Sequence, residues 1–532
     1  MIFMGTSNIQ DLKYGNIDIA SAYWGSDLVW SKKKESFYNV FISPVNFRNL
    51  LRHSYLQGYS MNDIQEIKFI DNYNKNNNFY SNSINELFFY GNEINNSAYS
   101  FKDITYYNNN INYGYDYKNK ILYIEKPLLF QNKIIYYGGG STNMYKIDYG
   151  TYHGAFSNCK SLFSINFLNF DKTDIFESFC YNCKSLLTPI CPNNAERLTN
   201  SYCQCSNLVV AICKDNVTNL HSAYQYCSNI ISAACGKKVI DMSYAYMRCT
   251  NLKYPAIGNN IVNLYGAYAE CYNLLYALCS ENVSNMEYAY TNCYNITNAI
   301  CGSNVISMNS AYINCFNLIK AEVGKKVINM TFTYSYCSNL TNAVCGPNVF
   351  DMRGAYYHCS NLLIPNVGEN VWSMAETFRY CSNLKFSVCS NKVRNMAYAY
   401  SSCANLINAV CGPNVWNMTY AYSHCANLIN AVCGPNTSEM RGTYYNCPKI
   451  CGNLYINSNN VQYFNSCFYN RNNQNQLNIY VYSNTVSNAA LYNNNLYANY
   501  TSGANNYWNI WSNGLGYSDE TNNVYVYYLD KI

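Results

Sequence analysis

The chain has 532 residues, with 35 Lys and Arg against 30 Asp and Glu, and a net charge of +5. So small an excess on so long a chain gives no basic stripe, and we expect no DNA or RNA partner. No apolar run approaches about 18 residues, so we expect no membrane insertion. The first residues lack the basic start and apolar run of a secretory signal, which favours assembly in a cytosol.

Residues 1–34 are predicted to form a small β module. Ile17–Ile19, Ala22–Ser26 and Leu28–Trp30 alternate apolar and polar residues around a Gly-Ser turn, which predicts a hairpin. The stretch from Tyr23 to Trp30 resembles short amino-terminal modules of bacteriophage tail and virion surface proteins. That resemblance implies attachment to a particle through this region. The alternative is an ordinary hairpin that caps the next domain.

Residues 35–140 show no clean period and are predicted to be an irregular, β-rich amino-terminal cap. Ile67–Ile70, Glu86–Tyr90 and Ile121–Ile124 are predicted to be strands between Asn-rich loops. A stacked array needs its first apolar surface covered, so a cap is expected at this place.

Residues 141–450 are predicted to be a repeat array. A first cysteine recurs every 22 residues, at Cys183, Cys205, Cys227, Cys249, Cys271, Cys293, Cys315, Cys337, Cys359, Cys381, Cys403, Cys425 and Cys447. The period can be written C-x-N-L-x-x-A-x-C-G-x-N-V-x-x-M-x-x-A-Y-x-x. A fixed period of this length indicates a solenoid in which each coil touches only its neighbours.

The L-x-x-A-x-C-x-x-N part resembles leucine-rich repeats, and V-x-x-M-x-x-A-Y-x-x-C resembles the BspA-type repeats of bacterial surface proteins. The resemblance implies a leucine-rich-repeat solenoid with short parallel strands at L-x-x-A-x-C. Met308 stands where that family has Ile, and Tyr312 where it has Phe. We expect both columns to be core packing. The period of 22 is shorter than the family's usual 23.

The cysteines are predicted to be free thiols in the core. In three coils Ile257, Val323 and Val367 replace the second cysteine, as expected of a small buried apolar position. If neighbouring coils pair as parallel strands, the first cysteines of adjacent coils lie about 4.8 Å apart. This is wider than the Cβ–Cβ separation of about 3.8 Å that a disulfide needs. No second pair at ligand spacing follows, so we expect no metal. The asparagines two residues later, such as Asn317, are expected to satisfy buried turns.

Residues 451–532 are predicted to be a β-rich carboxy-terminal cap. The five histidines are scattered, and His358 and His424 occupy a position that holds Tyr or Ser in other coils. Such a position is not a general base. We therefore expect no enzyme and no cofactor.

The candidate contact surface lies on the outward face of the predicted strands. The residue between the buried Ala and Cys of each coil is mostly apolar, and a long exposed apolar stripe usually marks an interaction surface. The alternative is that β-branched residues simply favour strands. The predicted contact residues are Tyr254, Tyr276, Leu278, Ile300, Val344, Phe386, Val388, Val410 and Val432.

These observations favour a bacteriophage virion protein, such as a tail or head fibre, whose array recognises a protein or glycan on a host. It would bind other virion proteins through its amino-terminal region, and we also allow for a homo-oligomer. It would be assembled in the host cytoplasm and reside in the virion. The alternative is a bacterial cell-surface adhesin or interaction scaffold, and a purely structural virion role also stays open.

Overall fold

The computed structural model describes residues 176–456 throughout, together with residues 65, 156–160, 162, 467–468 and 475–480. Beyond these it describes only the backbone of the strands named below. The chain forms two compact units, Met1–Asp174 and Ile175–Ile532. The finer predicted division into four segments stays a prediction.

In the first unit the structure describes mainly short strands. Two antiparallel pairs come first, β1 (Leu12–Tyr14) with β2 (Ile17–Ile19) and β3 (Ser21–Trp24) with β4 (Asp27–Ser31). One sheet has the order β6 (Glu66–Ile70), β11 (Ile121–Glu125), β10 (Ile111–Asp116) and β7 (Asn82–Ile84). The other has the order β12 (Ile135–Tyr137), β5 (Asn39–Ile42), β8 (Leu87–Ile94) and β9 (Phe101–Asn108).

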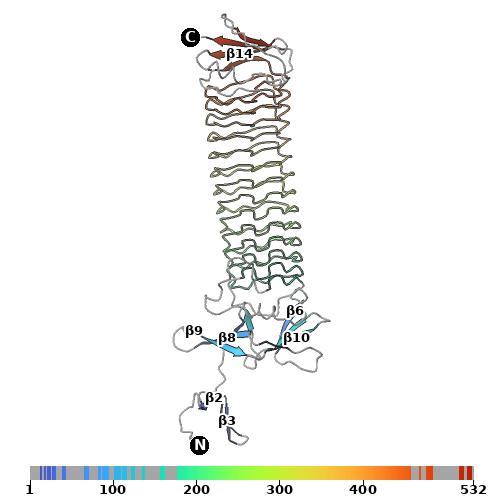
Figure 1. Ribbon diagram of the computed structural model, residues 1–532, viewed down its shortest axis with the longest axis vertical. Coiled ribbons are helices and arrows are strands. Elements are labelled where there is room, and N and C mark those ends of the chain that lie inside the picture. The colour runs from blue at the N-terminus through green and yellow to red at the C-terminus, as the bar shows by residue number, and fades with distance from the viewer. Residues whose placement is uncertain are drawn as a thin grey trace, which may run out of the picture. The chain divides into compact units, whose positions relative to one another are not determined.

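In the second unit, successive 22-residue stretches form coils stacked one on the next (Figure 1), so this part is a repeat solenoid. Its core is the column of apolar side chains that the period predicts. In one representative coil, the fully buried side chains include those of Ile296, Val305, Met308 and Tyr312. The Met and Tyr columns are therefore core, as expected.

The segment from each Met to the next first Cys is a series of tight turns. Within a coil, the Ala311 N–H donates to the Met308 C=O at 3.0 Å, and the Cys315 N–H donates to the Tyr312 C=O at 3.2 Å. The alternate N–H groups point to the following coil, as in Tyr312 to Thr333 at 2.9 Å. Ser310 and Asn314 hold the left-handed backbone conformation, with φ of 56° and 60°. Nearly every coil repeats this pair.

The predicted strand at L-x-x-A-x-C was wrong in extent. That segment makes only isolated bridges, such as Asn298 to Lys320, while an unbroken parallel ladder of bridges runs just before the Met column, from Arg197 to Glu439. The reason is the orientation of the residue between Ala and Cys. The Ile300 N–H donates to the Tyr312 Oη at 3.1 Å, and this Oη donates to the Ile300 C=O at 2.7 Å. Both polar groups therefore face inward instead of toward neighbouring coils.

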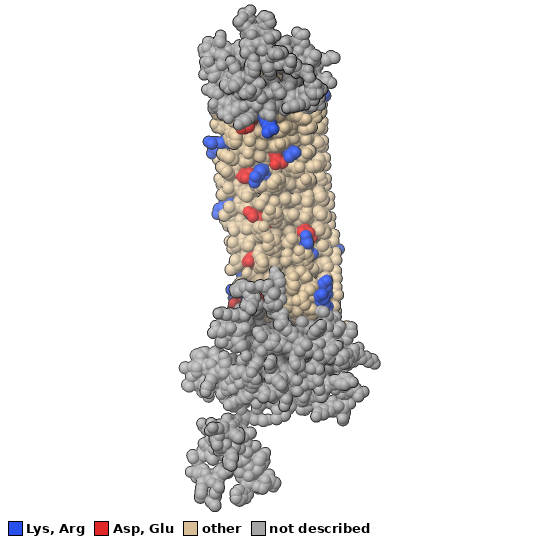
Figure 2. Space-filling view, in the orientation of Figure 1, with Lys and Arg blue, Asp and Glu red and all other residues tan. Residues whose placement is uncertain are grey.

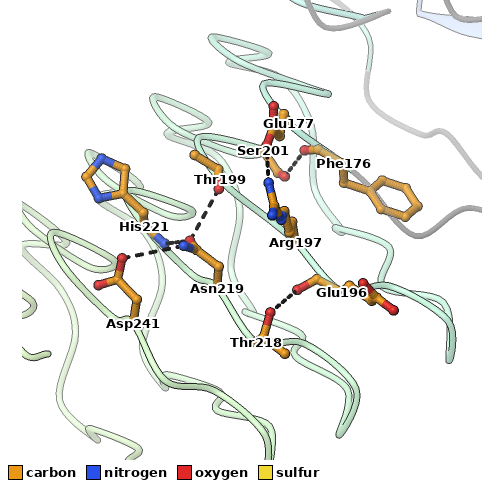
Figure 3. Close-up of polar contacts among 10 residues, drawn as sticks. All are labelled: Phe176, Glu177, Glu196, Arg197, Thr199, Ser201, Thr218, Asn219, His221 and Asp241. Atoms are coloured by element: carbon orange, nitrogen blue, oxygen red, sulfur yellow. Dashed lines mark hydrogen bonds and ion pairs between the residues drawn. The ribbon is translucent and has the colours of Figure 1, made fainter. Parts of the chain in front are cut away.

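Polar side chains support the ladder before the Met column (Figure 3). The Asn219 Oδ1 accepts the His221 N–H at 2.8 Å and the Thr199 hydroxyl at 3.2 Å, and the Asn219 amide donates to Asp241 at 3.4 Å. Asn or Asp in this place therefore turns the chain within one coil and links it to the next.

The first cysteines occupy the core and act as hydrogen-bond donors. The Cys315 thiol donates to the Tyr290 C=O of the preceding coil at 3.3 Å, and the contact recurs in every coil from Cys205 to Cys447. The second cysteines are half-buried in most coils, as at Cys279 and Cys345, and are less enclosed than predicted. All 27 cysteines lie in the described part, and the structure pairs none of them.

The asparagines after the first cysteine are mostly exposed, so the expectation that they satisfy buried turns was wrong. Asn317 is one of the exposed members. The asparagine before each buried Val links neighbouring coils more regularly. The Asn304 amide donates a hydrogen bond to the Glu281 C=O of the previous coil at 2.8 Å. Where Lys326 replaces it, the ammonium donates to Asn304 at 2.6 Å.

Four strands follow the last coil, in the order β13 (Gly452–Ile456), β14 (Leu477–Tyr482), β16 (Val524–Leu529) and β15 (Leu515–Asp519). The Tyr444 N–H donates to the Cys467 C=O at 2.9 Å, and the Phe468 ring stacks on Tyr444 at 5.5 Å. The core column thus continues past the repeats. No helix in the described part of the chain is long and apolar enough to cross a bilayer.

Candidate recognition surface

The structure separates the predicted contact residues into three groups. Tyr254 and Tyr276 lie on adjacent coils and are 47% and 44% exposed. Phe386, 57% exposed, occupies the same position five coils farther, about 24 Å away at the usual strand spacing. The remaining predicted residues do not form an exposed stripe. Val410 is exposed, but the other five are half-buried: Leu278, Ile300, Val344, Val388 and Val432.

A different surface carries most of the chemical variety. We define the turn face as the exposed and half-buried side chains at and beside the two left-handed positions of each coil, for example Phe332, Tyr336, Arg353 and Tyr357. At the first left-handed position the coils carry Asn200, Ser222, Tyr244, Gly266, Tyr288, Ser310, Phe332, Gly354, Glu376, Tyr398, Tyr420 and Gly442. Tyr288 is exposed and most of the other large side chains in this set are half-buried, whereas the two serines and the three glycines are buried. The accessible members are rich in Tyr, as in evolved recognition surfaces.

Aromatic rings on the turn face form a connected network across several coils. Tyr336 contacts Tyr357 edge to face at 5.4 Å, and Tyr357 contacts Tyr380 in the same way at 5.6 Å. His358 lies between Tyr336 and Tyr380, with ring centroids 5.0 and 5.3 Å away. Tyr336 and His358 are exposed, so the network is accessible from solvent.

Arg379 lies inside this network. Its guanidinium is 4.8 Å from the Tyr398 ring centroid and 5.0 Å from that of Tyr380, within the range of cation–π attraction. The same group forms an ion pair with Glu376 at 3.0 Å. A second cluster, around Arg248, has the same chemistry: Arg248 covers the Tyr226 ring at 5.1 Å and pairs with Glu270 at 2.8 Å.

Three aromatic rings of the turn face lie over a glycine of the following coil: Tyr244 over Gly266, Phe332 over Gly354 and Tyr420 over Gly442. A Cβ on Gly266 would come within 2.9 Å of the Tyr244 ring, and the other two glycines are more crowded still. All three glycines have φ between 55° and 60°, where a side chain is strained. Glycine therefore lets the ring lie against the coil.

This surface can bind by stacking and by hydrogen bonding. Contacts with the following coil hold two histidine rings of this surface. The His221 Nδ1 lies 2.7 Å from the Ser243 hydroxyl, and the His424 ring centroid lies 5.4 Å from that of Tyr445. Among the described residues, no three metal-ligating side chains gather in one place. On the side of the solenoid seen in Figure 2, Lys, Arg, Asp and Glu are sparse among the described residues.

Sequence reasoning missed the turn face because non-glycine residues hold most of the left-handed positions. One signal was present: Met-Arg-Gly-x-Tyr-Tyr occurs at 352–357 and again at 440–445. A glycine at the same place in both copies indicates a backbone requirement.

Comparisons with known proteins identify similar structures but no family. No family model matches the chain, and no curated protein matches it. A leucine-rich repeat protein from Bacteroides ovatus is similar, with a TM-score of 0.44 and 13% identity over 71% of this chain and 95% of the other. A leucine-rich cell surface protein from Faecalibacterium prausnitzii has a TM-score of 0.38 and 15% identity, over 56% and 85%. Neither likeness is close enough to assign a function.

Proposed function

We propose that this chain is a non-enzymatic recognition protein that binds its ligand with the turn face of its repeat array. The observation that carries the proposal is the contrast between the two kinds of position in each coil. The core columns hardly change along the array, whereas the turn face carries Tyr, Phe, Arg, His and Glu at equivalent places. A rigid scaffold with a variable surface is how repeat proteins bind ligands.

The ligand would be a protein or a glycan on a cell surface. Exposed Tyr and His rings supply contact area at little cost in conformational entropy, because each has only two rotatable bonds. The resemblance of Tyr23–Trp30 to virion modules supports the virion alternative, whereas the antiparallel pairing of β3 and β4 fits both that module and an ordinary cap. Detecting the chain on intact bacterial cells or in purified phage particles distinguishes these two locations.

The test compares two double variants in the full chain. Tyr336→Ser with His358→Ser removes exposed rings from the turn face, and Tyr254→Ser with Tyr276→Ser removes them from the originally predicted surface. Binding to a panel of intact bacterial cells and to a glycan array is measured. We expect the first pair to lose at least about tenfold in affinity and the second to stay near the parent.

If the Tyr254→Ser, Tyr276→Ser variant lost affinity and the Tyr336→Ser, His358→Ser variant did not, the binding site would lie at Tyr254 and Tyr276 and not on the turn face. Absence of binding to every cell and glycan in the panels would count against recognition altogether. Circular dichroism of both variants checks that the array remains folded.

A further inference from the structure

Two neighbouring positions of each coil form an exposed band along the array. They directly follow the buried Leu or Ile of the coil, as Ile319 and Lys320 follow Leu318. The twelve coils from Leu187 to Asn430 give 24 such positions, of which Asn430 is half-buried and the others are exposed. The large apolar residues of the band are Leu187, Val209, Val210, Ile231, Tyr254, Leu275, Tyr276, Ile319, Leu363, Ile364, Phe386, Ile407 and Ile429.

The backbone holds both positions of the band outward and links them from coil to coil. The Ile319 N–H and the Lys320 N–H both donate to the Thr297 C=O of the preceding coil, at 2.8 and 3.3 Å. Because two successive N–H groups share one acceptor, the chain bends here and both side chains point away from the core. A parallel bridge also joins Asn298 to Lys320. The side chains of the band therefore repeat about every 4.8 Å along the array.

The band has the size and composition of a protein–protein interface. Its 24 residues match the roughly 20–30 that one partner contributes to a standard interface. Only two coils, those of Thr297 and Thr341, lack a large apolar residue in the band. Soluble monomers rarely leave an apolar patch larger than a few hundred Å² exposed. The band holds no Asp or Glu, and its charged members are Lys253, Lys320 and Lys385.

We propose that the band is the interface between two antiparallel copies of this chain. This inference goes beyond the proposed function and does not depend on what the turn face binds. A partner that covers the band must offer apolar side chains over eleven coil intervals, about 53 Å. A second copy has the same length and spacing by construction, and a two-fold dimer uses one surface on both partners. Tyr254 and Tyr276 then serve association between copies and not ligand binding.

The lysines of the band decide the orientation of the two copies. In a parallel dimer each coil meets its own copy, so Lys253, Lys320 and Lys385 each lie beside the same lysine of the partner. Like charges set together in an interface are strongly unfavourable. An antiparallel dimer with its two-fold axis between the coils of Asn298 and Lys320 places these two residues opposite each other, and Lys253 opposite Leu363. No lysine then faces another, and the carbon stem of Lys253 covers Leu363.

The experiment measures self-association of the full chain by analytical ultracentrifugation. We expect a dimer with a dissociation constant of about 1 μM or tighter. Leu363→Lys sets a like charge opposite Lys253 of the other copy and should weaken the dimer at least about tenfold. Leu363→Glu sets an opposite charge there, and its dimer should be at least about tenfold tighter than that of Leu363→Lys.

Ile328→Lys is the matched control. Ile328 lies outside the band and is 49% exposed, against 47% for Leu363. Its substitution adds the same charge to the solenoid and should change the dissociation constant by no more than about twofold. Circular dichroism of all three variants checks that the coils remain folded.

Three results would overturn the proposal. A parent chain that stays monomeric through the micromolar range would exclude the dimer, and a loss of cell binding in Leu363→Lys would then assign the band to the ligand. Equal weakening by Leu363→Lys and Ile328→Lys would place the interface elsewhere. Equal weakening by Leu363→Glu and Leu363→Lys would exclude the antiparallel arrangement. If the dimer behaves as expected while turn-face variants bind cells like the parent, the association stands and the proposed function fails.

Discussion

The phenol of Tyr312 binds both backbone polar groups of Ile300, accepting from its N–H at 3.1 Å and donating to its C=O at 2.7 Å. The same arrangement recurs from Tyr202 with Ile190 to Tyr444 with Val432. One hydroxyl thus satisfies two groups that the coil turns inward. This explains why the core column is Tyr and not Phe, because Phe would leave both groups without a partner.

Phe378 is the exception in this column, and it provides a test. Phe378→Tyr should place a hydroxyl opposite the backbone of Asn366 and raise the free energy of unfolding by about 1–2 kcal/mol. The matched control is Tyr356→Phe, which removes the hydroxyl that binds Val344 and should lower that free energy by about 1–3 kcal/mol. Urea unfolding measures both, and no change in either variant would contradict the assigned role.

The thiol ladder should contribute as a donor as well as by packing. The Cys293 thiol donates to the Tyr268 C=O at 3.1 Å. Cys293→Ala should cost about 1–3 kcal/mol, from the cavity and the lost hydrogen bond. Cys293→Ser keeps a donor and should recover part of the loss, because a buried hydroxyl can make the same kind of bond, as Thr333 does with the Met308 C=O at 2.9 Å. In urea unfolding, equal loss in both variants would leave packing as the whole contribution.

Thiol reactivity should differ sharply between the folded and unfolded chain. Burial raises the pKa of Cys279 to about 11, so little thiolate exists near neutral pH even at this half-buried position. We expect about 27 thiols to react with a chromogenic disulfide reagent in denaturant, and few without it. Fewer than about half reacting in denaturant would mean that disulfides had formed.

Stability should fall at alkaline pH. Burial holds the pKa of Tyr290 well above 10.0 and that of Cys271 well above 9.0. The unfolded chain therefore loses these protons first, so their contribution is complete below about pH 8 and declines as pH rises above it. We expect the urea midpoint to hold steady from pH 7 to about 8 and then to fall steeply. A flat profile up to pH 11 would contradict the burial of these groups.

Opposite changes at equivalent left-handed positions should have opposite effects. Gly354→Ala puts a Cβ into the space of the Phe332 ring at a φ of 60°, and should cost at least about 1–2 kcal/mol. Ser310→Gly relieves a residue at a φ of 56° and should be neutral or stabilising by up to about 1 kcal/mol. Thermal unfolding measures both. A stabilised Gly354→Ala would show that the ring is not seated on the glycine.

Much of the solenoid could be predicted because its core is encoded in side chains. Leu318, Met308 and Cys315 recur at fixed intervals, and only stacked coils bury all of them together. The predicted contact surface was less successful. Tyr254 and Phe386 are exposed, but Ile300 and Val388 are half-buried because their backbone turns toward a tyrosine.

By itself the sequence determined the period, the core columns and the aromatic and cysteine content, since these depend only on which residues recur and how far apart. Only the tertiary structure decided which surface is exposed and varied. That outcome depends on the direction of each N–H and C=O, and on left-handed conformations held by residues such as Tyr398 and Glu376. Such conformations are intrinsically unfavourable for these residue types, and the hydrogen bonds to neighbouring coils maintain them.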